Sequence, residues 1–195
     1  TRHIIDNHYV WSNEHVLVAK KCRKIPLEIV VRGYITGNTS TSLWTHYSNG
    51  SREYCGLKFP DGLVRDQQLS EPVITPTTKG EIDEPISGEE ILRRNVVLPG
   101  EWEYIQRKAL ELYRYGQMVA RSADLILVDT KYEFGYDSNG KIVLIDELHT
   151  CDSSRYWRLS TYQERFSKGL SPQKLDKDAV RDYIKSLCDP YKVEK

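Results

Sequence analysis

In the second half of the chain, charged residues recur at every second position within a segment that is otherwise rich in strand-forming residues. Residues 125–135 are rich in β-branched and aromatic types, and a second apolar run covers residues 142–147. The segment between them, residues 137–140, ends in an Asn-Gly pair that suits a tight type I′ turn, so the sequence predicts a β-hairpin. Successive side chains of a strand point to opposite faces. One face is expected to carry Asp129, Lys131 and Glu133, and the other Ile126, Val128 and Tyr132.

The length of the turn decides whether two acids of this hairpin face each other. A two-residue loop at residues 139–140 would pair Ser138 with Lys141 and set Glu133 directly opposite Asp146. A four-residue loop would keep both carboxylates on one face, two positions out of register, and a three-residue loop with a bulge would break the alignment. Facing carboxylates repel each other, so a hairpin that tolerates them is expected to bind a cation. Oxygen ligands beside a lysine indicate Mg²⁺ held for a phosphate-bearing substrate.

A simpler explanation is that Lys131 only neutralises the two acids in an exposed charge cluster, which is a common and weakly stabilising arrangement. The sequence that follows favours a binding site instead. Residues 146–157 carry further acids, hydroxyl groups, an arginine and a tryptophan. Such a density of hydrogen-bonding groups where a strand ends is typical of a binding loop on a rigid scaffold.

Three segments of the chain resemble sequence signatures of the SAICAR synthetase family, the phosphoribosylaminoimidazole-succinocarboxamide synthases of purine biosynthesis. They are residues 25–37, residues 128–135, and residues 146–157. Two shorter segments resemble the same family: residues 75–79 and residues 175–181. The resemblance extends from about Lys20 to the end of the chain, and three motifs in the right order make it specific.

The resemblance implies a nucleotide and metal site in the hairpin. In this family the acids that match Glu133 and Asp146 coordinate the Mg²⁺ ions that bridge the nucleotide phosphates. Lys131 would then lie beside the metals and the transferring phosphoryl group, as a cation that counters developing charge. Asp129 is expected to orient Lys131 within the catalytic group. Lys79 is expected to bind the nucleotide together with Lys131 and the two acids.

The resemblance also implies a pocket for the imidazole substrate. Glu28 and Arg32 lie four residues apart on one predicted strand, and therefore on one face, and in the family both are ligands of this substrate. The Arg32 guanidinium group suits a carboxylate or a phosphate. The alternative for such a pair, and the more usual arrangement, is a cross-strand salt bridge. The other expected substrate-binding residues are Thr36, Gly37, Asn38, Thr39, Asp152, Ser154, Arg155 and Arg181.

Two of these substrate contacts have alternatives. Many relatives carry serine where Asn38 stands, so Thr39 or the backbone would have to supply a hydroxyl-like contact there. Residues 36–39 offer hydroxyls and N–H groups that could nest an anion. Lys177 and Arg181 could equally form the solvated face of the last helix.

The reaction implied for this family joins L-aspartate to 5-aminoimidazole-4-carboxyribonucleotide with ATP, and gives SAICAR, ADP and phosphate. A carboxylate is a poor acyl donor, so ATP first converts it to an acyl phosphate, which the aspartate amine then attacks. The protein positions the reactants and neutralises charge, and no residue acts as a covalent nucleophile. Two rivals stay open: a small-molecule or inositol-phosphate kinase of related fold, and a non-catalytic nucleotide-binding fragment.

The elements that must position these residues form an α+β domain, in which helices pack on an antiparallel sheet and the ligand loops lie at one end. The clearest helix is predicted over residues 99–123, where apolar residues recur at three- and four-residue steps. A terminal helix is predicted over residues 176–187, with Val180, Ile184 and Leu187 facing inward. The resemblance adds that this is the ATP-grasp-like C-terminal domain of the SAICAR synthetase fold.

Composition sets the expected partners and compartment. Lysine plus arginine and aspartate plus glutamate both number 28, so no net charge favours nucleic acid or a membrane surface as a partner. The sequence has no long apolar run and no signal peptide, and its four cysteines lack CxxC spacing, which together indicate a cytoplasmic protein with reduced thiols. The oligomeric state is left open.

The start of the chain sets the expected domain limits. The only methionine is Met118, and nothing before Lys20 resembles the glycine-rich lobe that covers the ATP phosphates in the family. We therefore expect the C-terminal portion of a longer enzyme. Residues 1–19 would be a hinge and the end of the N-terminal nucleotide-binding lobe, and residues 20–195 the catalytic and substrate-binding domain.

Overall fold

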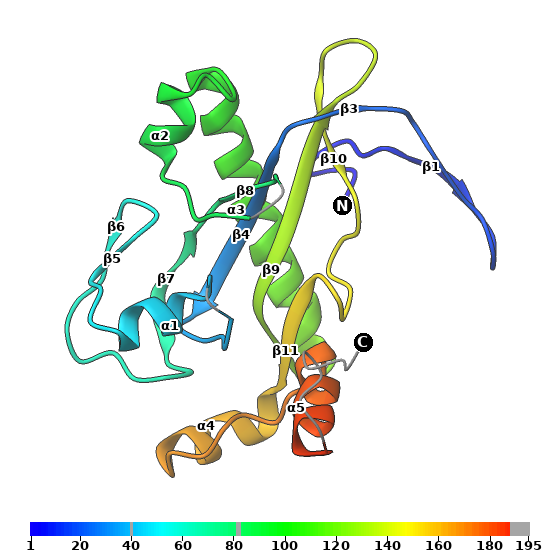
Figure 1. Ribbon diagram of the computed structural model, residues 1–195. Helices are drawn as coiled ribbons and strands as arrows, with labels where there is room; N and C mark the ends of the chain where they lie inside the picture. The colour runs from blue at the N-terminus through cyan, green and yellow to red at the C-terminus, as the bar shows by residue number, and fades with distance from the viewer. Residues whose placement is uncertain (40, 81–82, 188–195) are drawn as a thin grey trace, which may run out of the picture.

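Strand β9 (Leu125–Tyr136) is the centre of a seven-stranded antiparallel sheet (Figure 1). The computed structural model describes residues 1–39, 41–80 and 83–187. One edge of β9 pairs with β3 (Arg23–Lys24) and β4 (Leu27–Tyr34), and the other edge pairs with β10 (Ile142–Ile145) and β11 (Ser154–Arg158). Beyond β4 lie β7 (Gln68–Ile74) and β8 (Thr77–Thr78). The predicted α+β domain with an antiparallel sheet is confirmed.

The main hydrophobic core lies between this sheet and helix α3 (Pro99–Ser122). Trp102, Ile105 and Leu112 form part of the buried stripe of the helix, as the apolar spacing predicts. Pro99 suits the first helical position, and the Glu101 carboxylate accepts a hydrogen bond from the Leu98 N–H group at 2.8 Å. The long predicted helix is therefore confirmed, and it forms a rigid support behind β9.

Shorter elements surround the sheet. Helix α1 (Leu43–Ser48) packs near the small hairpin of β5 (Glu53–Tyr54) and β6 (Leu57–Lys58), and α4 (Leu159–Ser167) follows β11. Helix α2 (Gly88–Arg93) begins at Ser87, whose hydroxyl accepts a hydrogen bond from the Glu90 N–H group at 3.1 Å.

The β9–β10 hairpin is present, and its turn is the three-residue loop, one of the three turn lengths considered from the sequence. Asp137 and Lys141 close a three-residue loop, and the Asp137 carboxylate accepts hydrogen bonds from the N–H groups of Asn139 and Lys141, both at 2.9 Å. A type I′ turn needs positive φ at both central residues, whereas Gly140, with φ +77°, has it and Asn139 does not. The type I′ turn that the Asn-Gly pair suits is therefore not formed.

A bulge in β9 also changes which side chains share a face. The pairing of β11 with β9 skips Val128, which is an extra residue in β9. Ile126 and Val128 pack with Trp157 in a small separate cluster, while Tyr132 packs in the main core. The prediction that Ile126 and Val128 share a face with Tyr132 is wrong, because one inserted residue reverses the alternation.

Helix α5 (Lys177–Leu187) confirms the predicted terminal helix but not its packing. The side chains of Val180, Ile184 and Leu187 are exposed, so the prediction that they face inward is wrong. The start of the helix is held by charge instead, through an ion pair between Asp178 and Arg155. Polar contacts, which an apolar spacing pattern does not register, decide the orientation of this helix.

An arm formed by β1 (Tyr9–Ser12) and β2 (Leu17–Ala19) reaches away from the sheet (Figure 1). Just before it, Ile5 is buried in the main core and the His8 N–H group donates to the Leu144 carbonyl at 3.1 Å. Among the described helices, none is long and apolar enough to cross a membrane. Three cysteines are free thiols, Cys22, Cys55 and Cys151, and Cys188 lies outside the described residues.

Candidate functional site

A polar pocket of about 200 Å³ lies where β4, β9, β11 and the start of α5 meet. The sheet register creates it, because β9 carries ligand residues along its middle and receives further ones from both neighbouring strands. Eight of the predicted site residues line this pocket: Glu28, Arg32, Asp129, Lys131, Asp152, Ser154, Arg155 and Arg181.

Asp129 lies between two arginines because β9 pairs with a strand along each edge. The registers set Arg32 of β4 and Arg155 of β11 directly opposite Asp129. The Asp129 Oδ2 atom lies 2.7 Å from Arg155 Nη1 and 3.4 Å from Arg32 Nη1, and Asp129 is only 4% exposed. A carboxylate buried this deeply would be costly without cationic partners, so the two guanidinium groups stabilise it. The Asp129 carboxylate was expected to orient Lys131. In the structure it pairs with the two arginines instead.

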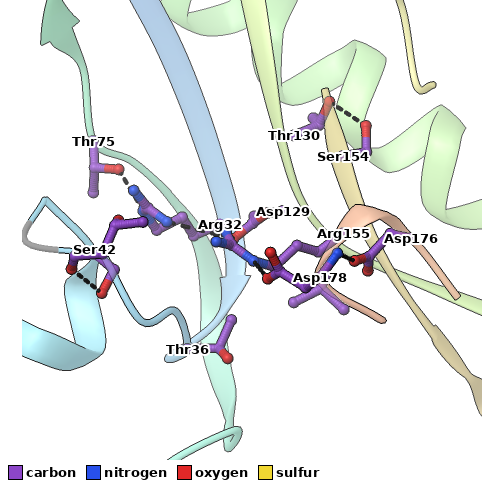
Figure 2. A network of polar contacts seen from close by, with 12 residues as sticks. Arg32, Thr36, Ser42, Thr75, Asp129, Thr130, Ser154, Arg155, Asp176 and Asp178 are labelled. Carbon is purple, nitrogen blue, oxygen red and sulfur yellow. Dashed lines mark hydrogen bonds and ion pairs between the residues drawn. The ribbon is translucent and has the colours of Figure 1, made fainter. Parts of the chain in front are cut away.

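The chain of charges continues from Arg155 to helix α5, as Figure 2 shows. Arg155 Nε donates to Asp178 Oδ2 at 2.8 Å, and Arg181 Nη1 donates to Asp178 Oδ1 at 3.2 Å. The charge of Asp129 is the main cause that raises the pKa of Arg155 above its ordinary value, against the effect of burial. Burial alone would raise the pKa of Asp178, but Arg155 and Arg181 hold it below its usual range. The network fixes the start of α5 beside the pocket.

A second cluster, of lysines and acids, adjoins the pocket at Lys131. The buried Glu133 carboxylate lies 2.7 Å from both Lys131 Nζ and Lys24 Nζ, and it also contacts Lys79. Lys131 Nζ lies 3.0 Å from Asp146 Oδ2. Burial opposes ionisation of Glu133, but hydrogen bonds from the three lysines lower its pKa below the ordinary value. The predicted repulsion between the two acids is therefore offset by ammonium groups.

The two acids meet through Lys131 rather than across the hairpin. The three-residue turn sets Glu133 opposite Ile145, and Asp146 is the first residue beyond β10. Asp146 adopts φ +63°, which turns the chain there. The facing register expected for a two-residue loop is therefore absent, and the alignment is broken as expected for a three-residue loop, yet both carboxylates lie within 3.0 Å of the same Nζ atom.

Glu28 and Arg32 contact the two clusters instead of each other. Glu28 Oε1 lies 3.4 Å from Lys79 Nζ and 3.6 Å from Lys131 Nζ. Arg32 Nε donates to the Thr75 hydroxyl at 2.8 Å. The cross-strand salt bridges considered for these residues are therefore present, from Arg32 to Asp129 and from Glu28 to Lys131, and both residues also line the pocket.

Residues 36–39 do not line the pocket with the others. The Thr36 hydroxyl donates to Asp66 Oδ1 at 2.5 Å, and the Asn38 side chain accepts a hydrogen bond from Arg65. Gly37 has φ +110° and lies against Ser42, where a Cβ atom would come within 2.4 Å of Ser42 Cβ. Thr39 is exposed. The structure therefore places this group of predicted substrate ligands beyond the end of β4, away from the pocket.

Four residues of the two clusters were not predicted as site residues: Lys24, Thr75, Lys177 and Asp178. Thr75, Lys177 and Asp178 belong to segments that resemble the family, and this membership could have indicated them as site residues. Lys24 has no such signal, because only the pairing of β3 with β9 brings it to Glu133.

The donor set at Glu133 and Asp146 fits Mg²⁺ bound together with a phosphate ligand. Both side chains offer carboxylate oxygens, and Mg²⁺ commonly takes one or two carboxylates and completes its shell with substrate phosphates and water. Within the described ranges, no group of three or more His, Cys, Asp or Glu side chains is arranged to hold a metal ion. A metal here would therefore depend on oxygens supplied by the ligand.

The fold and site together define a domain suited to a phosphate-bearing anion, with arginines and lysines on two sides of one pocket. Residues 1–195 match the family model described as SAICAR synthetase. The chain therefore belongs to the SAICAR synthetase family.

Its sequence relatives carry the name of one enzyme. The chain is 53% identical over 196 residues to phosphoribosylaminoimidazole-succinocarboxamide synthase of Legionella pneumophila, and covers 63% of that protein. It is 50% identical to the chloroplastic enzyme of the same name from Vigna aconitifolia, of which it covers 58%. All or nearly all of this chain thus corresponds to less than two thirds of each relative.

Solved structures agree with this membership. All of the chain superimposes on 69% of the SAICAR synthase of Saccharomyces cerevisiae in complex with SAICAR, with 29% identity and a TM-score of 0.76. A SAICAR synthetase in complex with ADP matches 92% of this chain and 66% of its own, with 26% identity and a TM-score of 0.71. The predicted SAICAR synthetase fold is confirmed.

Proposed function

We propose that this chain forms the substrate- and metal-binding domain of an enzyme that joins L-aspartate to 5-aminoimidazole-4-carboxyribonucleotide with ATP. The observation that carries the proposal is the junction at Lys131. This residue lines the arginine-rich pocket and also contacts Glu133 and Asp146, so one ammonium group connects the two halves of the site.

The acid–lysine cluster is the proposed site for the ATP phosphates. Lys131 and Lys79 offer ammonium groups to phosphate oxygens, and Glu133 and Asp146 would hold Mg²⁺. The metal, when bound, would supply positive charge to the phosphates. A related structure binds ADP, which supports a nucleotide here. Both lysines pair with carboxylates in this structure, so a bound phosphate would replace a carboxylate as the anionic partner of each lysine.

The arginine-lined pocket is the proposed site for the imidazole ribonucleotide, since arginine forks suit both phosphate and carboxylate. Arg155 and Arg181 share the Asp178 carboxylate, and Arg32 lies on the opposite wall. Ser154 and Asp152 add a hydroxyl and a carboxylate to the lining. A related structure binds SAICAR, which supports this class of ligand. Thr36, Gly37, Asn38 and Thr39 would take part only through a rearrangement beyond β4.

The proposed chemistry has two steps. A carboxylate oxygen of the imidazole substrate attacks the γ-phosphorus of ATP and ADP leaves, which forms an acyl phosphate. The aspartate amine then attacks the acyl carbon, loses a proton, and expels phosphate. Lys131 would stabilise the negative charge that moves between the phosphate oxygens, and the arginines would hold the substrate in line.

Two further points belong to the same proposal. We place the end of a nucleotide-binding lobe and a hinge in residues 1–19, where the exposed arm follows a segment anchored to β10. We also propose a cytoplasmic location for this protein, whereas two plant relatives are named as chloroplast proteins, so compartments differ within the family.

The deciding measurement is the substrate dependence of ADP release by the complete protein. We expect ADP release, and formation of the succinocarboxamide product, only when both the imidazole carboxyribonucleotide and L-aspartate are present. Equal ADP release without aspartate and without product would instead identify the small-molecule kinase alternative. Binding of nucleotide without any turnover would identify the non-catalytic alternative.

A further inference from the structure

The loop of residues 146–153 joins β10 to β11 and carries site residues at both ends. Asp146 contacts Lys131 at its start, and Asp152 lines the pocket near its end. The loop crosses the edge of β9 between the two strands that pair there. Its shape therefore decides whether the two clusters of the site face the same ligand.

His149, in the middle of this loop, is tied to the core by two tyrosine hydroxyls. Its Nε2 atom lies 2.6 Å from the Tyr132 hydroxyl, and its backbone carbonyl accepts a hydrogen bond from the Tyr156 hydroxyl at 2.7 Å. Tyr132 belongs to β9 and Tyr156 to β11, so both anchors stand on strands that build the site. The backbone of His149 has φ +55°, a conformation that few residues other than glycine adopt without compensating contacts.

Helix α3 provides the space that the imidazole ring occupies. Gly116 faces the ring, and a Cβ atom added there would lie 2.3 Å from His149 Cε1 and 2.8 Å from Nδ1. A glycine within a helix costs stability relative to alanine, so its presence at this contact is consistent with a demand for room.

Burial keeps both members of this hydrogen-bonded pair uncharged at neutral pH. Burial lowers the pKa of His149 to about 4, so the imidazole is neutral at neutral pH. Burial also raises the pKa of Tyr132 well above its ordinary value, so the phenol keeps its proton. The neutral imidazole carries one N–H group, and its tautomer sets whether Tyr132 or His149 donates in the bond between them.

We propose that His149 is a positioning residue, which holds the 146–153 loop against β9 and β11 so that Asp146 reaches the nucleotide cluster while Asp152 and its neighbours line the substrate pocket. The imidazole touches no ligand in this proposal and acts through the loop. The inference rests on the function proposed for the site, and it assigns a role to a residue that the family resemblance left without one.

The test uses variants of the complete protein that disturb the same contact from two sides. His149→Ala removes the ring, and Gly116→Ala pushes it from α3, where the added Cβ atom would also lie 2.8 Å from Leu127 Cδ2. Gly100→Ala is the matched control, because a Cβ atom at this other glycine of α3 meets nothing within 4 Å. His149→Gln keeps a polar side chain that can bond the Tyr132 hydroxyl, and serves as the conservative replacement.

We expect His149→Ala and Gly116→Ala to raise the KM for the imidazole ribonucleotide and the Mg²⁺ concentration at half-maximal rate by about tenfold, a size typical of residues that orient ligand-binding groups. Gly100→Ala should leave both values unchanged, and His149→Gln should restore most of the loss. Lower thermal stability with unchanged KM and Mg²⁺ requirement would show that the histidine only supports the fold, and would overturn the proposal.

Amide hydrogen exchange separates this inference from the proposed function. In His149→Ala and Gly116→Ala, exchange should quicken in residues 146–153 relative to wild type and Gly100→Ala, whatever reaction the protein catalyses. Quickened exchange in a protein that makes no succinocarboxamide would retain the positioning role and reject the proposed reaction. If the wild-type protein makes the succinocarboxamide but exchange in residues 146–153 of the two variants is unchanged, the positioning role is rejected and the proposed reaction is retained.

Discussion

A single ammonium group, that of Lys131, joins the two acids on which the proposed magnesium site depends. Glu133 is buried and also contacts Lys24 and Lys79, so three ammonium groups compensate its negative charge. Asp146 has a side chain that is 42% exposed and contacts Lys131 at 3.0 Å. An exposed ion pair of this kind contributes little to stability, so Asp146 is available for a ligand at small energetic cost.

This difference predicts the effect of Asp146→Asn. The free energy of unfolding should change by only about 0–1 kcal/mol, because the lost ion pair is largely solvated, while Mg²⁺-dependent turnover should be abolished. Thermal unfolding with and without Mg²⁺, together with turnover, measures both effects.

Asp6→Asn is the matched control for that variant. Asp6 contacts Lys141 Nζ at 2.5 Å, and its side chain is 52% exposed, so it forms a comparable ion pair away from the pocket. It should show an equally small change in stability and normal turnover. If Asp146→Asn turned over at the wild-type rate, the metal would have to lie elsewhere.

At the scale of elements, the bulge in β9 and the 146–153 loop arrange the site together. The bulge at Val128 reverses the alternation of side chains, so that Asp129, Lys131 and Glu133 face the ligand side while Tyr132 reaches the main core. From that core position Tyr132 can bond His149. The same irregularity thus directs the charged residues outward and provides an anchor for the loop.

The buried histidine of this loop predicts part of the pH dependence of stability. The pKa of His149 is lowered from 6.5 to about 4, so between these pH values the unfolded chain binds a proton that the folded chain excludes. The free energy of unfolding should therefore fall as pH decreases through this window, by on the order of 3 kcal/mol, and level off below it. Urea unfolding at several pH values, compared between wild type and His149→Gln, isolates this contribution. Parallel pH profiles for the two proteins would contradict the assignment.

At the scale of the whole molecule, the two halves of the site depend differently on the rest of the protein. The pocket proposed for the imidazole ribonucleotide is lined by residues of β4, β9, β11 and α5 of this chain. In the proposed arrangement, part of the phosphate cradle for ATP belongs to a further lobe. The chain covers 63% of its Legionella relative, which leaves room for such a lobe in proteins of that length.

The 195-residue chain by itself should therefore bind ATP more weakly than the complete protein, because one wall of the nucleotide site would be absent. Calorimetric titration of both proteins with Mg²⁺-ATP measures this difference. Titration with the imidazole ribonucleotide is the control, since its proposed pocket lies within this chain and its affinity should change much less. Equal ATP affinities would contradict the proposed division into lobes.

Local sequence patterns predict the main hairpin, the long helix and the residue types of the site. The β9–β10 hairpin and helix α3 follow from local patterns of apolar residues and turn formers, which act over a few positions of the chain. The charged residues of β9 were found because alternation along one strand is a local property. Family motifs supplied the rest of the predicted site, and eight residues of the whole predicted site, two of them from β9, meet in one pocket.

The way in which these elements fit together depends on contacts between distant parts of the chain. The turn of three residues, the bulge at Val128 and the left-handed backbone of Asp146 set the final register, and each depends on contacts between strands. The exposure of the apolar residues of α5 and the arrival of Lys24 at Glu133 likewise result from packing between distant segments. Local patterns report which face of an element is apolar, whereas long-range ion pairs and hydrogen bonds decide where that element is placed.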